Sequence, residues 1–445
     1  MHIRKCSRLV AAMVLAVLAA SVMPTAATAV PTFNTLFSFC NDPNFGCENT
    51  GSTPQAALLR DAQGNLFGTA EVGNDNGHGT AYELIFDPAQ QTYSFKLIYR
   101  FCQKTLGNLC LDGLQPASNL IMDVNGNLYG TTTQGGKNNQ GIIFELVHHN
   151  QHNYALKVLH AFCNRVNCKD GADPAAGLTY QGEEAGALYD GSASLYGTTL
   201  HGGTANNAGV AYRFTPGGGP AYQVIRNFCW VQNSCSGGAF PLGLTIDANG
   251  LLYGIAEEGG RHGQGVLFRL SPHGNRYSET ILYAFCRRAG CTDGREPSGP
   301  VSIDAAGNIF GTTTRGGKND SGVVFELNTV RHETVLYSFC KTQPNCGDGS
   351  GPSGNIVVAS NGDIFGTTEQ GGNSASCCGV LFRIRAGKET VLHTFCPNPG
   401  LNCDPDGEFP FGGLITDGSG NLYGTTLNGG QAETFAGGTV FQLTP

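Results

Sequence analysis

Charged residues are scarce in this sequence, and basic residues do not outnumber acidic ones. They make up 13% of the chain, with 26 Lys and Arg against 34 Asp and Glu, which gives a net charge of −8. Nucleic-acid binding normally requires a basic patch, so this balance argues against a nucleic-acid partner. No segment shows a sustained apolar period of 3.6 residues, and the sequence therefore predicts no long amphipathic helix.

Only one long apolar run is present, from Leu9 to Met23 near the N-terminus. Three basic residues precede it, and small residues ending at Ala29 follow it. A basic start, a short apolar core and a small-residue end are typical of a cleavable secretory peptide, and the core is short for a membrane anchor. We therefore predict a signal peptide at 1–29, one domain over 30–445, no membrane span after cleavage, and a secreted or periplasmic protein.

Sequence motifs of common catalytic sites are also missing. The chain contains no H-E-x-x-H, no G-x-S-x-G, no P-loop and no phosphate-binding G-x-G-x-x-G on a helix. We therefore predict no catalytic residue, no metal site and no cofactor. Catalytic residues can come from distant segments that sequence spacing does not connect, so an enzyme stays an alternative.

A dipeptide, Phe-Cys, recurs at intervals of 54 to 66 residues. Its seven copies begin at Phe39, Phe101, Phe162, Phe228, Phe285, Phe339 and Phe395. Each unit continues with a second cysteine, a G-x-x-P step, a strand-like segment, a D-x-x-G-N turn, a strand such as Leu128–Thr132, a Gly-Gly loop and a further strand. Strands rich in Val, Ile, Tyr, Phe and Thr between turn residues predict antiparallel β-structure.

Four short strands per unit suit a β-propeller blade, so the sequence predicts a seven-bladed all-β propeller with four-stranded antiparallel blades. The two ends of the chain support this topology. The last unit stops at its third strand, near Leu443, while a spare fourth strand, Phe33–Cys40, stands at the start. We predict that this N-terminal strand completes the last blade and closes the ring, which would protect exposed sheet edges.

The repeat resembles the GloVer repeat of the choice-of-anchor tandem repeat proteins. The resemblance rests on a G-N-L-Y-G-T-T segment followed by a Gly-Gly pair, best seen at Gly126–Thr132, Gly307–Thr313 and Gly420–Thr426. It implies an exported bacterial protein and says nothing about chemistry. The family's anchored members carry a sorting segment, whereas this sequence stops at Pro445 directly after a strand, so we expect release or periplasmic retention.

Cysteines are numerous, with 17 in the chain, of which one lies in the predicted signal. In an exported protein an even set predicts disulfides. The simplest pairing is one local bond per unit: Cys40/Cys47, Cys102/Cys110, Cys163/Cys168, Cys229/Cys235, Cys286/Cys291, Cys340/Cys346 and Cys396/Cys403. A zinc role would need two pairs to converge. Cys377 and Cys378 are adjacent and form either a strained vicinal disulfide or two thiols.

Aspartates precede the Gly of the G-x-x-P step in five units: Asp112, Asp170, Asp293, Asp348 and Asp406. In a propeller these loops lead to the innermost strands, so we expect a broken ring of carboxylates around the channel mouth that could attract a cation or a hydroxyl-rich ligand. The alternative is ordinary Asp-Gly turn chemistry. Trp230, the one tryptophan, could stack on a sugar or cover a blade junction.

The near uniformity of the units favours a non-catalytic extracellular binding or scaffold protein, with a glycan or envelope protein as partner. The alternative is a polysaccharide hydrolase or lyase that uses pairs of the five aspartates as acid and base or nucleophile. A purely structural surface protein is the third possibility.

Overall fold

The computed structural model describes residues 30–445, apart from 41–46, 74–76, 151–152, 205, 220, 230–234, 275, 342–343, 373–377, 397–404 and 431–436. The chain separates into two units, Met1–Val30 and Pro31–Pro445, and the fold is that of the second unit. The predicted signal peptide lies outside the described residues. Within the described part of the chain, no helix has the length and apolar character needed to cross a membrane.

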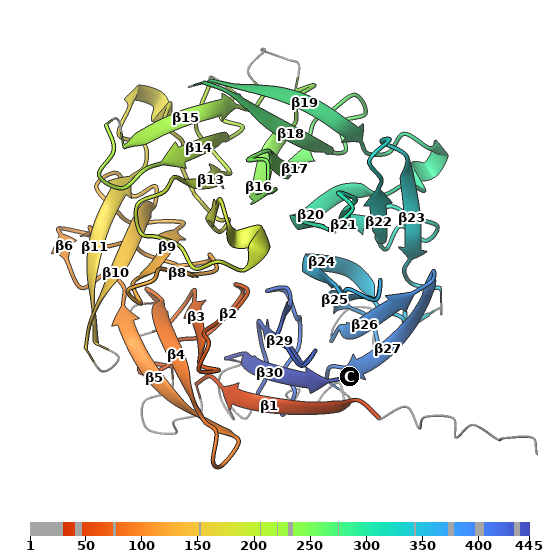
Figure 1. Cartoon of the computed structure of the whole chain (residues 1–445), viewed down its shortest axis with the longest axis horizontal. Helices are drawn as coiled ribbons and strands as arrows, with labels where there is room; N and C mark the ends of the chain where they lie inside the picture. Colours follow the sequence, from red (N-terminus) through yellow and green to blue (C-terminus); the bar gives the residue numbers. More distant parts are fainter. Residues whose placement is uncertain are drawn as a thin grey trace, which may run out of the picture. The chain divides into compact units, whose positions relative to one another are not determined.

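Seven four-stranded antiparallel sheets are arranged as the blades of a propeller, which confirms the predicted fold (Figure 1). Six blades use four consecutive strands, counted from the axis outward. The first three are β2 (Leu59–Arg60), β3 (Leu66–Ala70), β4 (Thr80–Asp87), β5 (Thr92–Arg100); β8 (Ile121–Met122), β9 (Leu128–Thr132), β10 (Ile142–Asn150), β11 (Asn153–Ala161); and β12 (Thr179–Tyr180), β13 (Leu195–Thr199), β14 (Val210–Phe214), β15 (Tyr222–Asn227).

The next three blades follow the same order. They are β16 (Ala239–Ile246), β17 (Leu252–Glu258), β18 (Val266–His273), β19 (Arg276–Ala284); β20 (Arg295–Ile303), β21 (Ile309–Arg315), β22 (Val323–Leu327), β23 (Glu333–Ser338); and β24 (Ser350–Val358), β25 (Ile364–Gln370), β26 (Val380–Arg385), β27 (Lys388–Thr394). Short extra elements are β6 (Thr105–Leu106), β7 (Leu109–Cys110), η1 (Val166–Cys168), η2 (Glu183–Ala185) and η3 (Ala289–Cys291).

The last blade joins the two ends of the chain. It consists of β28 (Ile415–Thr416), β29 (Leu422–Thr426), β30 (Thr439–Thr444) and β1 (Thr32–Ser38). β1 pairs antiparallel with β30, with Phe33 opposite Leu443. This pairing confirms the predicted closure by the N-terminal strand.

The middle strands of the blades are buried on both faces, because each blade packs between two neighbours. Every residue of β9 and β29 is buried, whereas the first six residues of β5 alternate between exposed and half-buried. The glycine in the L-Y-G-T-T strand makes this packing possible. A Cβ at Gly311 would lie 2.7 Å from Cζ of Phe325, which faces it on the next strand. The recurrent Gly therefore provides space for an aromatic core residue.

The G-x-x-P step connects each blade to the preceding one. The residue before the proline has a φ between 55° and 63° in all seven units: Thr53, Gln115, Asp173, Phe240, Glu296, Gly351 and Phe409. Its backbone N–H donates to a carbonyl of the preceding blade, at 2.9 to 3.1 Å. The left-handed conformation, unusual outside glycine, thus recurs wherever two blades meet.

One insertion interrupts the sevenfold repetition. The segment between β12 and β13, which includes η2, projects toward the middle of the ring (Figure 1). It contacts both neighbouring blades, because Val124 N–H donates to Tyr189 O at 2.9 Å and Gln181 Nε2 donates to Asp247 O at 3.2 Å. The insertion lies on the face that carries the D-x-x-G-N turns, which we call the turn face. The opposite face carries the cysteine loops and the Gly-Gly loops, and we call it the loop face.

Candidate functional site

Each cysteine loop runs from the outermost strand of one blade to the innermost strand of the next. Six local disulfides are present among the described residues, at the positions predicted: Cys40–Cys47, Cys102–Cys110, Cys163–Cys168, Cys229–Cys235, Cys286–Cys291 and Cys340–Cys346. Cys378 and Cys396 are each disulfide-bonded as well, and both side chains are fully buried in one cluster. Cys377 and Cys403 lie outside the described residues, so the seventh local pair and the vicinal pair stay predictions.

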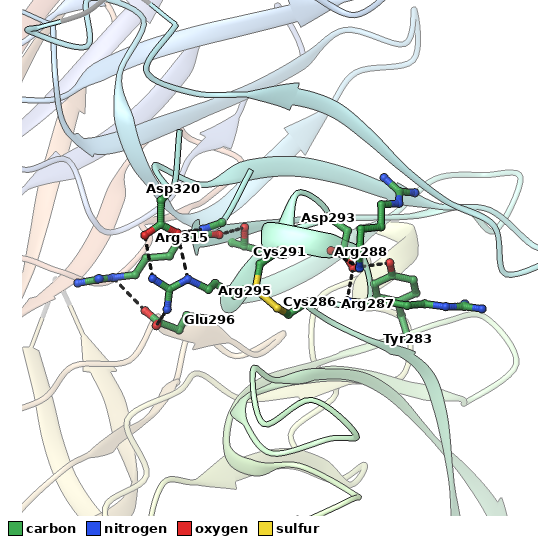
Figure 2. The surroundings of a disulfide bond; sticks show 12 residues. Tyr283, Cys286, Arg287, Arg288, Cys291, Asp293, Arg295, Glu296, Arg315 and Asp320 are labelled. Carbon is green, nitrogen blue, oxygen red and sulfur yellow. Dashed lines mark hydrogen bonds and ion pairs between the residues drawn. A yellow bond between two sulfur atoms is a disulfide. The ribbon is translucent and has the colours of Figure 1, made fainter. Parts of the chain in front are cut away.

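Asp293 shows what the aspartate of the cysteine loop does. Its carboxylate accepts hydrogen bonds from the hydroxyl of Tyr283 at 2.7 Å and from the backbone N–H groups of Arg287 and Arg288 at 2.8 and 3.1 Å (Figure 2). Its side chain is fully buried beside the Cys286–Cys291 disulfide. The carboxylate thus points toward the outermost strand and organises its own loop.

Asp112 and Asp348 repeat this arrangement. Asp112 accepts from the hydroxyl of Tyr99 at 2.6 Å and from two backbone N–H groups, and it too is fully buried. Asp348 accepts from the hydroxyl of Tyr337 at 2.9 Å and from the N–H of Lys341 at 3.0 Å. Accepting several such bonds satisfies a buried carboxylate.

In two blades a histidine takes the place of the tyrosine. Asp406 lies 3.2 Å from Nε2 of His393, and Asp170 lies 3.8 Å from Nε2 of His160. Burial lowers the pKa of His160 to about 4, and Asp170 opposes this shift. His160 is therefore neutral near pH 7 and packs as an aromatic ring on Tyr222, with their centroids 3.9 Å apart.

The five predicted aspartates thus have structural partners in their own loops or on the outermost strand before the loop. The structure does not bring them together around the axis, and a ligand role for them stays a prediction. Trp230 lies outside the described residues, so its predicted sugar contact stays a prediction as well.

Other carboxylates gather at the end of the two innermost strands of several blades, on the loop face. We call Glu71, Asp173, Glu257, Glu296 and Glu369 the axial carboxylates. They belong to five different blades. Each either comes directly after the L-Y-G-T-T strand segment or occupies the left-handed position before the proline.

Two pairs of axial carboxylates influence each other across blade boundaries, Glu71 with Asp173 and Glu257 with Glu296. Burial raises the pKa of Glu71, and the charge of Asp173, two blades away, raises it further. Glu257 is exposed, but the surrounding protein partly desolvates its carboxyl and raises its pKa, as do the charges of Glu258 and Glu296. Burial also raises the pKa of Glu369. Like charges held close together favour a ligand that donates hydrogen bonds or carries positive charge.

Basic side chains neutralise part of this cluster. Arg295 and Arg315 approach the two carboxylate oxygens of Glu296 at 2.8 and 3.2 Å (Figure 2). His201 Nδ1 lies 3.2 Å from Asp173. Glu71, Glu257 and Glu369 have no basic partner among the described residues, although Glu71 accepts a hydrogen bond from Gln55 Nε2 and Glu369 interacts with the side chain of Ser353.

Among the described residues, one group of side chains could be considered as metal ligands. Ligand atoms of His78, Cys102 and Cys110 lie within 4.8 Å of one another. Both sulfurs belong to the Cys102–Cys110 disulfide, which leaves the histidine as the one ligand. A disulfide sulfur is not the thiolate that transition metals bind.

The fold and the repeated loops define a tandem-repeat β-propeller held together by local disulfides. The sequence model of the Gloeobacter/Verrucomicrobia repeat family matches residues 25–192, 185–403 and 291–445. The chain belongs to this family, as its repeat motif predicts. No curated protein matches it.

Several solved structures resemble this chain at low identity. A putative 6-phosphogluconolactonase from Bacteroides uniformis is 13% identical, with 82% of this chain and 95% of that chain covered and a TM-score of 0.45. A Trypanosoma rangeli sialidase is 10% identical, with 94% and 60% covered and a TM-score of 0.43. A PQQ-bound aldose sugar dehydrogenase from Streptomyces coelicolor is 14% identical, with 94% and 99% covered and a TM-score of 0.42. These similarities carry no information about activity.

Proposed function

We propose that this protein is an exported, non-catalytic propeller that binds a ligand on its loop face through the axial carboxylates. The observation that carries the proposal is that five blades each place a carboxylate at the loop-face end of their two innermost strands, with raised pKa values at Glu71, Asp173, Glu257 and Glu369. The ligand is a hydroxyl- or amino-bearing glycan, since the cluster offers mainly hydrogen-bond acceptors and negative charge.

Export is supported by the disulfides, because such bonds persist in oxidising compartments. The predicted signal peptide at 1–29 agrees with this location, either outside the cell or in the periplasm. The protein thus acts where it meets envelope and extracellular polysaccharides.

A glycan array tests the binding function. We expect the purified protein to bind neutral or amino glycans. The double variant Glu71→Gln/Glu257→Gln should bind about ten-fold more weakly or worse, since about 1.4 kcal/mol lost corresponds to a factor of ten. Asp190→Asn on the turn face, where Asp190 bonds its own backbone turn, is the control and should leave binding unchanged. Absence of binding to every glycan, peptide and envelope fraction would contradict the proposal.

A polysaccharide hydrolase or lyase is the second candidate, because Glu257 has a raised pKa next to two further carboxylates. Two carboxyls with different pKa values are the requirement for paired acid and base catalysis. Incubation with a polysaccharide panel distinguishes the two functions. Product release that Glu257→Gln abolishes would establish the enzyme and replace the binding function.

A further inference from the structure

A groove on the outer rim of the propeller lies along β15 of the third blade. It consists of two adjoining hollows of about 630 and 600 Å³ that share Arg165 and Val224. The first extends to Ser194 and Gly219, near the turn face, and the second to Thr204, in the Gly-Gly loop. Six strand residues span about 20 Å at the usual rise per residue, so the groove is long enough for several sugar units.

The outer hairpin beside this groove is short. β15 has 6 residues, as β23 has, whereas β11 and β19 have 9. The loop before β15 contains Gly217 and Gly219, whose surroundings are open. Tyr222 does not fill the hollow, since its ring stacks on His160 and its hydroxyl donates to Asp170 O at 2.5 Å.

The lining of the groove is basic, although the whole chain is acidic. Arg165, Lys169 and Arg213 line it, and no Asp or Glu side chain does. None of the three makes an ion pair with a carboxylate among the described residues, whereas several arginines elsewhere do: Arg226 with Glu279, Arg288 with Glu333, Arg295 with Asp320, and Arg385 with Asp363. The nearby carboxylate of Asp170 is buried and accepts from the backbone N–H groups of Asn164 and Arg165.

Neutral polar groups complete the lining. Arg213 donates to Gln223 Oε1 at 2.8 Å, which orients its guanidinium group. The hydroxyls of Ser194 and Thr215 lie 2.7 Å apart at the same end of the groove. The groove therefore combines cations that suit carboxylates with hydroxyls that suit sugar hydroxyls.

We propose that this groove binds an acidic polysaccharide, a polyuronate chain that lies along β15. Arg165, Lys169 and Arg213 bind its carboxylates, and Ser194 and Thr215 bond its hydroxyls. The site is separate from the axial carboxylates, which lie on the loop face and attract ligands of the opposite charge.

Affinity electrophoresis of the full chain in gels containing polygalacturonate, alginate or neutral dextran tests the proposal. We expect both polyuronates, and not dextran, to retard the protein, with an effect that falls as salt is added. Arg165→Gln/Arg213→Gln should weaken the retardation about ten-fold or more. Arg276→Gln/Lys388→Gln removes two exposed cations on other blades and is the matched control that should bind like the parent.

Thermal unfolding of each variant shows whether the substitutions leave the fold intact. Glu71→Gln/Glu257→Gln should keep its polyuronate binding, which separates this site from the loop face. The proposal is overturned if the polyuronates fail to bind, if dextran binds equally well, or if the matched control loses as much affinity. Tighter binding of single-stranded DNA than of polyuronate would overturn it in favour of a nucleic-acid site.

Discussion

At one core position a hydroxyl group distinguishes two blades from the other five. The third strand carries tyrosine in the first and third blades, at Tyr82 and Tyr212, and phenylalanine in the others: Phe144, Phe268, Phe325, Phe382 and Phe441. Both tyrosines are fully buried, and their hydroxyl oxygens have no hydrogen-bond partner among the described residues. A buried polar group without a partner reduces stability.

We therefore predict that Tyr82→Phe and Tyr212→Phe each stabilise the protein by about 1 kcal/mol. The other blades show that a phenyl ring fits this position. Tyr99→Phe is the control and should destabilise, because the Tyr99 hydroxyl donates to Asp112 at 2.6 Å. Denaturant unfolding measures all three, and a loss of stability in both core variants would contradict the prediction.

A carboxyl on the outer strand of the sixth blade makes stability depend on pH. Burial raises the pKa of Glu389 to about 7, and Asp348 adds to the shift while Lys341 opposes it. The folded state binds the proton of the Glu389 carboxyl more tightly than the unfolded state does. The stabilising contribution of this proton is therefore complete below the ordinary glutamate pKa of 4.5 and is lost as pH rises through 7.

Glu389→Gln should therefore raise the melting temperature by a few degrees above pH 7 and have little effect in acid. Melting curves of the parent and the variant across this range measure the difference. The control is Glu184→Gln, an exposed residue of the insertion, which should leave the pH profile unchanged. Parallel profiles of the parent and Glu389→Gln would exclude Glu389 as the source.

At the scale of the element, the cysteine loop recurs in all seven units. The first cysteine has a positive φ in every unit: Cys40, Cys102, Cys163, Cys229, Cys286, Cys340 and Cys396. The buried aspartate then accepts backbone N–H groups of the residues that follow. Where the aspartate is missing in the first loop, Thr50 Oγ1 accepts the N–H of Cys40 at 3.1 Å. Side chain and disulfide thus hold the same turn together.

Asp293→Ala should destabilise the protein by about 2–4 kcal/mol, because it leaves three donors without their acceptor in a buried loop. Asp320→Asn is the control. Its side chain is 57% exposed in an ion pair with Arg295, and Asn suits the left-handed backbone and can still accept the N–H of Gly316, so the change should cost less than about 1 kcal/mol. Denaturant unfolding measures both values. Equal effects of the two variants would show that Asp293 is not a structural centre of its loop.

The local features of these loops could be predicted from the sequence, but the directions of their side chains could not. The Phe-Cys period predicts the blades, the spare Phe33–Cys40 strand predicts closure, and short cysteine spacing predicts local disulfides, since each signal lies within one repeat. The direction of the Asp293 carboxylate depends on the left-handed Cys286 and on Tyr283 of the preceding strand. Sequence spacing does not encode such side-chain directions.

The axial carboxylates were missed for a related reason. Glu71 and Glu257 come directly after their G-T-A and G-I-A segments, which is a recognisable position. The influence of Asp173 on Glu71 and of Glu296 on Glu257 arises only when separate blades pack around one axis. The rim groove likewise depends on how the loop before β15 folds, and its weak signal is the Gly-rich segment Gly217–Gly219.

At the scale of the whole molecule, stability depends on joining the two ends of the chain. Phe33 on β1 stacks on His393 with centroids 3.7 Å apart and contacts Phe395 and Phe441 at 5.6 and 5.4 Å. Phe37 stacks on Phe95 of the first blade at 4.6 Å. β1 thus covers the aromatic side of the last blade and connects it to the first.

Deletion of 31–38 should leave the edge of β30 unpaired and the rings of Phe395 and Phe441 uncovered. An exposed edge strand pairs with other chains, so we expect the truncated protein to melt at a lower temperature and to associate in sedimentation velocity. A milder change, Phe37→Ala, should keep the protein monomeric and cost about 2–3 kcal/mol, somewhat less than for a fully buried ring.

A circular permutant distinguishes the effect of losing β1 from the effect of where the chain ends lie. Thr32 and Thr444 face each other across the closing pair, so a short linker can join the two ends, and the chain can be opened at the exposed Val330 in a hairpin turn. The permutant keeps β1 beside β30 and should therefore remain monomeric and melt close to the parent. If it melts like the truncated protein instead, the position of the chain ends, rather than the pairing of β1 with β30, determines the stability of the ring.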